Sequence, residues 1–297
     1  MKKIIVLIVA IMTIGMFTPA IRSNAQNGFV SIFITPSSEV QQGRTSILQV
    51  MGPNIEKVTA TFAGRRFDLY RTNVGNWAGL LAVDMDATLG ANTLDIYYWT
   101  DENQEPQVIS QQIVVLPGGF DFQDIPLPYD LEPLLDPELN EYDFQSIERV
   151  HMRQTREIFF TTFQQPIPGP SISSFGGFRS YNNGVLTGRH TGIDYRAVIG
   201  TAVTAAANGR VVFAQYLPIH GNHIIIDHGW GILTGYSHLS EISVVPGELV
   251  YQGQTIGLSG ATGRVQGPHL HFEVAVNGSW VDGSQFLTLE IPLPAIN

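Results

Sequence analysis

The residues with the clearest capacity for chemistry lie near the C-terminus, in the run GPHLHFE at 267–273. Side chains of a β-strand alternate between its two faces, so His269 and His271 are expected on the same face. Two neighbouring imidazoles on one face of a strand, among apolar residues, are a suitable start for a metal site.

Two clusters upstream supply the other groups that such a site needs. His190 and Asp194 are four residues apart in the run RHTGID, a spacing that puts both on one face of a strand or of a helix. His238 follows in the run YSHL, among small and apolar residues. One carboxylate with several histidines is the composition of a catalytic zinc site, in which three protein ligands leave one position open.

The segment from about Phe175 to Leu287 resembles the lysostaphin-type (LytM-like) zinc metallopeptidases, a family that cuts peptide cross-links in bacterial cell walls. The motifs that carry the resemblance are HTGID at 190–194, YSHLS at 236–240 and GPHLHFEV at 267–274, in that order. The runs between them also fit the family: GTAVTAAANGRVVFA at 200–214, IIIDHGWG at 224–231 and GQTIGLSGATGRV at 253–265. Residues 1–165 lie outside the resemblance.

The resemblance implies that His190, Asp194 and His271 bind one zinc ion per chain. Two neutral imidazoles and one carboxylate leave a positively charged centre, which can lower the pKa of a bound water to about 7. The resemblance also implies that His238 and His269 flank this water and exchange protons during the reaction, with the division of roles between them left open.

Other polar residues of the C-terminal part receive weaker assignments. By the resemblance, Tyr181 is a candidate hydrogen-bond donor to the developing oxyanion. Tyr195 is expected to be a core aromatic. Glu273 shares the strand face of His271 and is expected to be either an acceptor behind a ligand or a buried polar residue. The remaining histidines of this part, His220, His223 and His228, are expected to have no catalytic role. His220 and His223 are candidates for the groove rim.

Composition excludes several classes of partner. The net charge is −10, and without residues 1–25 it would be −13, because that segment holds three basic residues (16 − 3 = 13 against 26 acidic). No basic stripe appears, so neither nucleic acid nor an anionic membrane surface is expected as a partner. The chain has no cysteine, which excludes disulfides and leaves histidine and carboxylate to hold any zinc.

Residues 1–25 have the pattern of a secretory signal peptide. Lys2 and Lys3 precede an apolar run from Ile4 to Phe17 that is too short for a comfortable transmembrane helix. Small residues at Ser23 and Ala25 predict cleavage before Gln26. An uncleaved membrane anchor is the alternative. We expect an exported protein of the periplasm or the extracellular cell envelope, with no stable membrane anchor after cleavage.

Residues 26–118 are expected to form a β domain. Seven segments have strand character, and Val58, Ala60 and Phe62 alternate with threonines as in a half-buried strand. The predicted strands are 30–35, 46–51, 58–63, 66–70, 77–83, 94–99 and 108–116. Such a series predicts an immunoglobulin-like β-sandwich, which we interpret as a spacer or positioning domain because it contains no catalytic constellation.

Residues 119–165 are expected to form a connector that is Pro-rich and then helical. The prolines and dispersed acids of 117–137 predict no regular structure. A helix is predicted over 140–157 from the helical spacing of Phe144, Ile147 and Val150, with Asn140 or Asp143 as its N-cap. His151 in this helix is expected at the surface. The connector is also a candidate for lying over the groove and keeping the enzyme latent.

Residues 166–297 are expected to form the zinc peptidase domain, mainly of antiparallel β-strands. Three Asn-Gly pairs, at 183–184, 208–209 and 277–278, predict hairpin turns. The glycines at 176–177 and the run GATG at 260–263 are expected to form walls of an open groove. The fold class is therefore mainly β throughout.

The sequence predicts an exported zinc metalloendopeptidase, a peptidoglycan hydrolase in which a zinc-bound water attacks peptide cross-links. Peptidoglycan peptides are the expected partner. The alternative is a non-catalytic module of the same fold that binds cell wall or activates another hydrolase, and the retention of all five site residues favours the enzyme. The bond stays open between D-Ala–diaminopimelate cross-links, glycine bridges and other peptides, and so does the oligomeric state.

Overall fold

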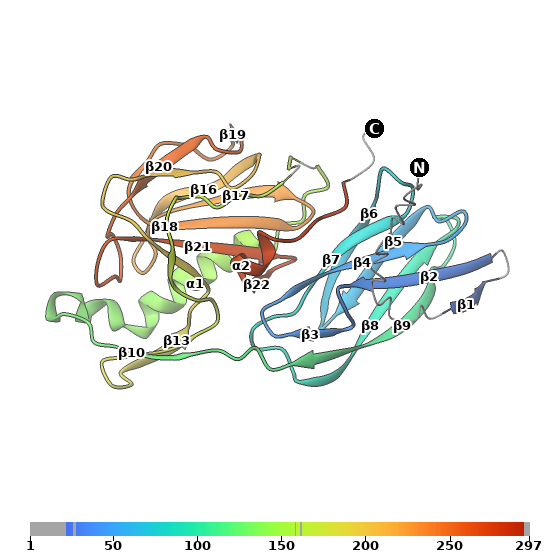
Figure 1. Cartoon of the computed structure of the whole chain (residues 1–297), viewed down its shortest axis with the longest axis horizontal. Coiled ribbons are helices and arrows are strands. Elements are labelled where there is room, and N and C mark those ends of the chain that lie inside the picture. Colours follow the sequence, from blue (N-terminus) through green and yellow to red (C-terminus); the bar gives the residue numbers. More distant parts are fainter. Residues whose placement is uncertain (1–21, 26–27, 158, 161, 294–297) are drawn as a thin grey trace, which may run out of the picture.

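Two β domains lie side by side and are joined by an extended connector that runs beneath the second of them (Figure 1). The computed structural model describes residues 22–25, 28–157, 159–160 and 162–293. The predicted signal peptide therefore falls largely outside the described residues. Within the described ranges, none of the helices combines the length and the apolar character needed to cross a bilayer.

The N-terminal domain is one curled sheet of nine strands in the order β1-β2-β4-β7-β6-β5-β8-β9-β3. All seven predicted strands are confirmed, and two short ones, β1 and β3, are added. The strands are β1 (Arg22–Ala25), β2 (Gly28–Thr35), β3 (Glu39–Gln41), β4 (Thr45–Met51), β5 (Lys57–Phe62), β6 (Arg65–Arg71), β7 (Trp77–Ala82), β8 (Gly90–Trp99) and β9 (Gln107–Leu116).

Alternating side chains of both halves of this sheet enclose a single apolar core. On β5 the alternation predicted from the sequence holds at Val58, Ala60 and Phe62, which are all buried. Their core neighbours include Leu48 from β4 and Ile96 from β8, so the sheet curls until its two halves face each other. A mainly β domain is confirmed, while its immunoglobulin-like topology stays a prediction.

The connector is more regular than predicted. It forms β10 (Phe122–Ile125), the 3-10 helix η1 (Tyr129–Leu135) and α1 (Pro137–His151). The prediction of no regular structure over 117–137 was wrong because β10 pairs in parallel with β12 along four residues, a long-range partner that local proline content does not reveal.

Helix α1 begins earlier and ends earlier than predicted. Its N-cap is Asp136, whose carboxylate accepts a hydrogen bond from the amide of Glu138 at 2.8 Å, with Pro137 at the first helical position. Neither Asn140 nor Asp143 is the cap. His151 is 1% exposed, not at the surface, because it lies four residues after buried Ile147 and packs against Trp280.

The C-terminal domain is built on a long antiparallel sheet in the order β11-β14-β21-β18-β17-β16-β19, with β15, β20 and β22 attached. Strands β10, β12 and β13 form a small separate sheet at its edge. The elements are β11 (Ser171–Ser173), β12 (Phe178–Tyr181), β13 (Leu186–Arg189), β14 (Gly192–Arg196), β15 (Ala202–Thr204), β16 (Gly209–Leu217), β17 (Gly221–Gly229), β18 (Ile232–Ile242), β19 (Leu249–Val250), β20 (Thr255–Ser259), β21 (His269–Val276), β22 (Ser279–Val281) and α2 (Gly283–Phe286).

Two of the three Asn-Gly pairs form the predicted hairpins. The pair at 183–184 joins β12 to β13, and the pair at 277–278 joins β21 to β22, with Val276 opposite Ser279. The hairpin at 208–209 was wrong, because β15 pairs with β20 instead of β16. Asn208 there accepts a hydrogen bond from the amide of Gln252 at 2.7 Å.

An apolar contact joins the two domains. Ile47, Leu80 and Met85 of the first domain belong to the core cluster of the second. The ring of Tyr70 stacks on Trp230 at 5.0 Å with nearly parallel planes. This contact is a packed extension of the C-terminal domain's core, and the role of the N-terminal domain as a positioning element stays a prediction.

Candidate active site

The centre of the site is a cross-strand pair. In the register between β14 and β21, Asp194 lies opposite His271, and Gly192 lies opposite Glu273. A Cβ at position 192 would stand 2.3 Å from the carbonyl oxygen of Phe272, so only glycine allows the two strands to approach this closely. The chain just before β14 brings in His190, whose backbone is held by hydrogen bonds to Gly176 and Gly177.

Three side-chain atoms converge at this point. Nε2 of His190 is 3.0 Å from Oδ1 of Asp194 and 3.0 Å from Nδ1 of His271. Nδ1 of His271 is 2.9 Å from the same Oδ1. All three residues are buried, and together they form a group that could hold a metal ion.

Hydrogen bonds behind the histidines indicate which nitrogens are protonated. Nδ1 of His190 lies 2.6 Å from the carbonyl oxygen of Ser174, which can only accept, so this nitrogen donates. Nε2 of His271 lies 3.3 Å from a carboxylate oxygen of Glu273 and is assigned as the donor on the same ground. The opposite ring nitrogens then present lone pairs toward the carboxylate of Asp194.

Three acceptors that point at one another need a cation between them. Their separations of 2.9–3.0 Å are close to the edge of a zinc coordination tetrahedron, which is about 3.3 Å for bonds of about 2.0 Å. The donor set of two imidazoles and one carboxylate is one that zinc accepts. The residues present therefore fit a zinc ion.

Asp194 is held on its other side by an arginine. Nη2 of Arg179, on β12, donates to Oδ2 of Asp194 at 2.7 Å. Burial alone would raise the pKa of Asp194, but the histidines nearby hold it well below its usual value, so the carboxylate is ionised. Arg179 thus fixes one oxygen and leaves Oδ1 for the converging histidines.

His238 and His269 lie beside these three residues, and Nδ1 of each ring faces a backbone carbonyl oxygen. Nδ1 of His238 lies 2.9 Å from the carbonyl oxygen of Thr262, and Nδ1 of His269 lies 2.8 Å from that of Gly267. Both rings therefore donate to backbone through Nδ1 and leave Nε2 as the acceptor, with Nε2 of His269 3.6 Å from Oδ1 of Asp194. Burial lowers the pKa of both imidazoles, so both are neutral near pH 7.

The backbone at His238 is strained. Its φ is +62°, in the left-handed region that a non-glycine residue rarely adopts. The ring centroid lies 4.8 Å from that of His269 and 5.8 Å from that of His271. Local strain at a side chain aimed into a cluster of titratable groups is a feature of functional sites.

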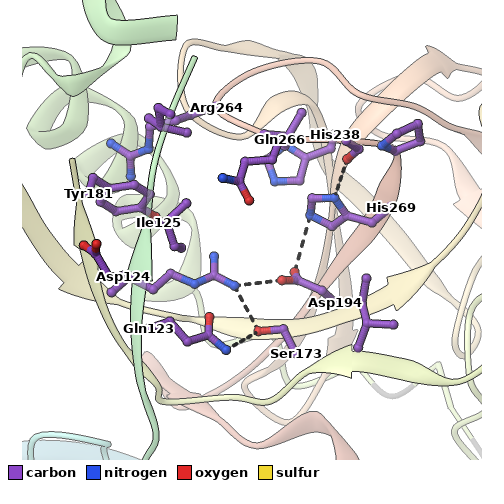
Figure 2. Close-up of a pocket in the computed structure, with 16 residues that line it drawn as sticks. Gln123, Asp124, Ile125, Ser173, Tyr181, Asp194, His238, Arg264, Gln266 and His269 are labelled. Carbon is purple, nitrogen blue, oxygen red and sulfur yellow. Dashed lines mark hydrogen bonds and ion pairs between the residues drawn. The ribbon is translucent and has the colours of Figure 1, made fainter. Parts of the chain in front are cut away.

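A cavity of about 550 Å³ opens next to these residues. Figure 2 shows Asp194, His238 and His269 on one side of the cavity and Tyr181 with Arg264 on the opposite side. Tyr181 is mostly buried, and no hydrogen bond joins it to the three converging residues in the described part of the chain. The wall also includes residues 123–125 of β10, so the connector lies along the groove.

The glycines predicted to form walls of the groove, at 176–177 and 260–263, do not line the cavity of the described structure. The cavity is lined by residues 264–269, directly after the run GATG. Gly263 itself packs against the backbone of Ile219, where an added Cβ would lie 2.4 Å from the carbonyl oxygen. Gly263 thus lets this loop pack closely on the backbone of Ile219, and Gly176 and Gly177 hold the backbone of His190 by hydrogen bonds.

A second buried network lies behind His271. Glu273 accepts a hydrogen bond from Thr191 at 2.5 Å and faces Nε2 of His220 at 3.6 Å. His220 pairs in turn with Asp143 of helix α1, which also accepts from the amide of Ile219 at 2.5 Å. Although burial lowers it, these carboxylates raise the pKa of His220 to about 10. Glu273 thus is both buried and an acceptor behind a proposed ligand.

The prediction that His220 and His223 lie at the groove rim was wrong for His223, which is fully buried on β17. His220 lies just before β17 and is also buried, but it lines a small cavity together with His190, His238 and His271. His228 is a buried core residue, and both of its ring nitrogens are hydrogen bonded, to Asn208 and Thr234, at 2.7 Å each. Tyr195 is a buried aromatic, as predicted.

Sequence reasoning missed three charged residues of the site. Arg179 lies two residues before Tyr181 on β12, so strand alternation could have placed both on one face. Arg264 lies within the run GQTIGLSGATGRV that carried part of the resemblance. Asp143 precedes buried Ile147 by one helical turn, which indicated a buried carboxylate.

Comparisons with known proteins match the part of the chain that carries this site. The sequence model of peptidase family M23 matches residues 188–283. Peptidoglycan DD-endopeptidase ShyA of Vibrio cholerae is 49% identical over 89 residues, which are 30% of this chain and 21% of that protein. DD-carboxypeptidase/endopeptidase Mpg of Neisseria meningitidis is 39% identical over 132 residues, which are 44% of this chain and 30% of that protein.

A solved structure shows the fold over most of the chain. A putative peptidase M23 from Pseudomonas aeruginosa superimposes with a TM-score of 0.65 at 23% identity, covering 83% of this chain and 94% of that one. The curated relatives are much longer than the matched segments, so they inform the peptidase domain. Residues 188–283 thus form a domain of the peptidase M23 type within this chain.

Proposed function

We propose that this protein is an exported zinc endopeptidase that hydrolyses the D-Ala–diaminopimelate cross-links of peptidoglycan. The observation that carries the proposal is the convergence of three lone-pair atoms, from His190, Asp194 and His271, beside two neutral histidines in an open cavity. The choice of cross-link rests on the names of the relatives ShyA and Mpg, which are a DD-endopeptidase and a DD-carboxypeptidase/endopeptidase.

His190 would hold the zinc ion through Nε2, His271 through Nδ1 and Asp194 through Oδ1. A zinc ion held by these residues would lower the pKa of a bound water to about 7 and would polarise the scissile carbonyl group. The backbone carbonyl of Ser174 and the carboxylate of Glu273 orient the two rings from behind. Arg179 keeps the carboxylate of Asp194 in place.

His238 and His269 would move the protons. Because both are neutral and have Nδ1 committed to a backbone carbonyl, each can accept a proton at Nε2. One of them takes the proton of the attacking water, and a proton is then delivered to the amine that leaves. Tyr181 lies across the cavity, where its hydroxyl is available to donate to a substrate oxygen.

The rest of the chain supports this role in the proposal. Residues 1–25 would direct export to the periplasm or cell envelope and then be removed. Residues 26–118 would act as a spacer that is packed against residues 166–297, and the connector 119–165 would form part of the groove.

The test is digestion of purified peptidoglycan sacculi, with mass spectrometry of the released fragments. The proposal predicts peptide-cleaved products that carry free D-Ala and free diaminopimelate amine, lost with a zinc chelator and restored by added zinc. Protein that carries zinc but releases only glycine-bridge products, or nothing from any sacculus, would contradict the proposed bond. Protein without zinc and without products would favour the binding-module alternative.

A further inference from the structure

Two arginine side chains enter the groove of a chain that is otherwise acidic. Arg179 and Arg264 both line the 550 Å³ cavity, although the whole chain has a net charge of −10. The acidic side chains that line the same cavity are Asp194 and Asp124. Asp194 is paired with Arg179, and Asp124 lies exposed, where it accepts a hydrogen bond from Ser180 at 2.9 Å.

No carboxylate forms an ion pair with Arg264 among the residues that the structure describes, although the charge of Asp143 acts on it from a distance. Its Nη1 donates to the backbone carbonyl of Leu134 at 3.2 Å, and its buried Nε has no hydrogen-bond partner. The guanidinium carbon lies 4.4 Å from the ring centroid of Tyr181, which supports it from one side. Burial lowers its pKa from the usual value, so this cation is poorly solvated.

The position of Arg264 is fixed by the connector. The carbonyl of Leu134 belongs to η1, and Gln266 donates to the carbonyl of Pro126 at 2.5 Å, so residues 264–266 are tied to the connector at two points. A guanidinium that is held in place, partly desolvated and open to a cavity on the far side from His269 is preorganised for a planar anion. Carboxylate is the planar anion that a peptide carries.

We propose that Arg264, stacked on Tyr181, binds a free carboxylate of the substrate peptide near the scissile bond. The inference rests on the proposed function and sharpens it, because diaminopimelate cross-links carry such a carboxylate while glycine bridges and amidated cross-links do not. Arg179, being paired with Asp194, contributes positive potential but not the direct contact. The groove thus selects acid-bearing cross-links over uncharged ones.

The experiment compares two cross-linked muropeptides that differ only in the side-chain carboxyl of diaminopimelate, free in one and amidated in the other. For the native zinc-loaded protein we expect the acid to be cleaved with a kcat/KM about 10- to 100-fold higher than the amide, the range of one charge-assisted contact. Arg264→Gln is expected to lose this preference and to cleave the amide as the native protein does. Arg264→Lys should retain part of the preference, because it keeps the charge and loses the planar fork.

A matched control is Arg210→Gln. Arg210 also donates to a single backbone carbonyl, that of Gly247 at 3.0 Å, and faces an aromatic ring, but it lies outside the groove. It should keep the full preference for the acid. Equal cleavage of acid and amide by the native protein, or an equal loss on both peptides in Arg264→Gln, would overturn the inference.

A binding measurement separates this inference from the proposed function. Calorimetric titration of the cleaved acid and amide product peptides into native protein and Arg264→Gln needs no turnover. Tighter binding of the acid by the native protein alone would support the carboxylate site even if no cross-link were cleaved. Equal binding of both products by a protein that cleaves sacculi would leave the proposed function standing and refute the role of Arg264.

Discussion

The chain's eight histidines form two sets that differ in what their ring nitrogens face, and all of them are buried except the partly buried His269. The groove set is His190, His238, His269 and His271, and the core set is His151, His220, His223 and His228. Burial does not separate the sets. Neither does the direction of the pKa shift, since burial lowers the pKa of His190 and of His228 alike to about 4.

The difference lies in the second nitrogen of each ring. In the groove set, one nitrogen is committed to a carbonyl or a carboxylate, and the other points to a shared point or to the cavity. In the core set, His228 has both nitrogens bonded and His151 has neither bonded. His223 of the core set has Nδ1 2.9 Å from the hydroxyl of Ser237 and, within the described residues, no hydrogen-bond partner at its buried Nε2. The groove set is therefore recognised by where the second nitrogen points, which is toward the shared point or the cavity.

The largest expected effect is a difference in bound zinc between variants of the groove set and variants of the core set. His271→Ala or His190→Ala removes one of three proposed ligands, so we expect loss of bound zinc and of detectable activity. His228→Gln in the core set should keep one zinc per chain. Elemental analysis of the purified variants is the measurement, and a His271→Ala protein with full zinc would refute the ligand assignment.

The second effect separates metal binding from proton transfer within the groove set. His238→Ala should retain zinc and lose activity by about 10²- to 10⁴-fold, the usual contribution of a general acid or base. The control is His151→Leu, which replaces a ring without hydrogen bonds and should keep activity. Unchanged turnover of sacculi by His238→Ala would remove it from the mechanism.

The third effect concerns the contribution of the buried pair between Asp143 and His220 to the stability of the fold. Asp143→Ala leaves the buried His220 without its carboxylate partner, so we expect a loss of about 3–5 kcal/mol in the free energy of unfolding. Glu148→Ala on an exposed position of the same helix should change it by less than about 0.5 kcal/mol. Urea denaturation of both variants measures the difference, and equal values would show that the Asp143 pair adds nothing.

The smallest effect is the acid sensitivity of the core set. Because the folded protein keeps His228 neutral, with its pKa lowered to about 4, the unfolded chain binds a proton first as the pH falls below 6.5. The free energy of unfolding should therefore fall between pH 6.5 and about 4, by up to about 3 kcal/mol from this residue. His228→Gln should flatten that part of the curve, whereas parallel curves would contradict it.

The strand pattern of the first domain was predictable because alternation at residues such as Val58 and Ala60 is a local property. The proposed ligands could be named from the motifs of the resemblance. Strand alternation places His269 and His271 on one face but does not say which of them binds a metal. The roles of β10 and Asp143 could not be predicted, because each depends on a partner far along the chain, β12 and His220. The stacking of Arg264 on Tyr181 likewise arises only when the connector closes along the groove.

The most direct test of the account is the location of zinc in crystals of the native protein by anomalous scattering at the zinc edge. The account predicts one strong peak within bonding distance of His190 Nε2, Asp194 Oδ1 and His271 Nδ1. His220, His271 and Glu273 form a second group whose ligand atoms are also close enough to hold a metal. A peak at that group, or no zinc at either, would contradict the central claim.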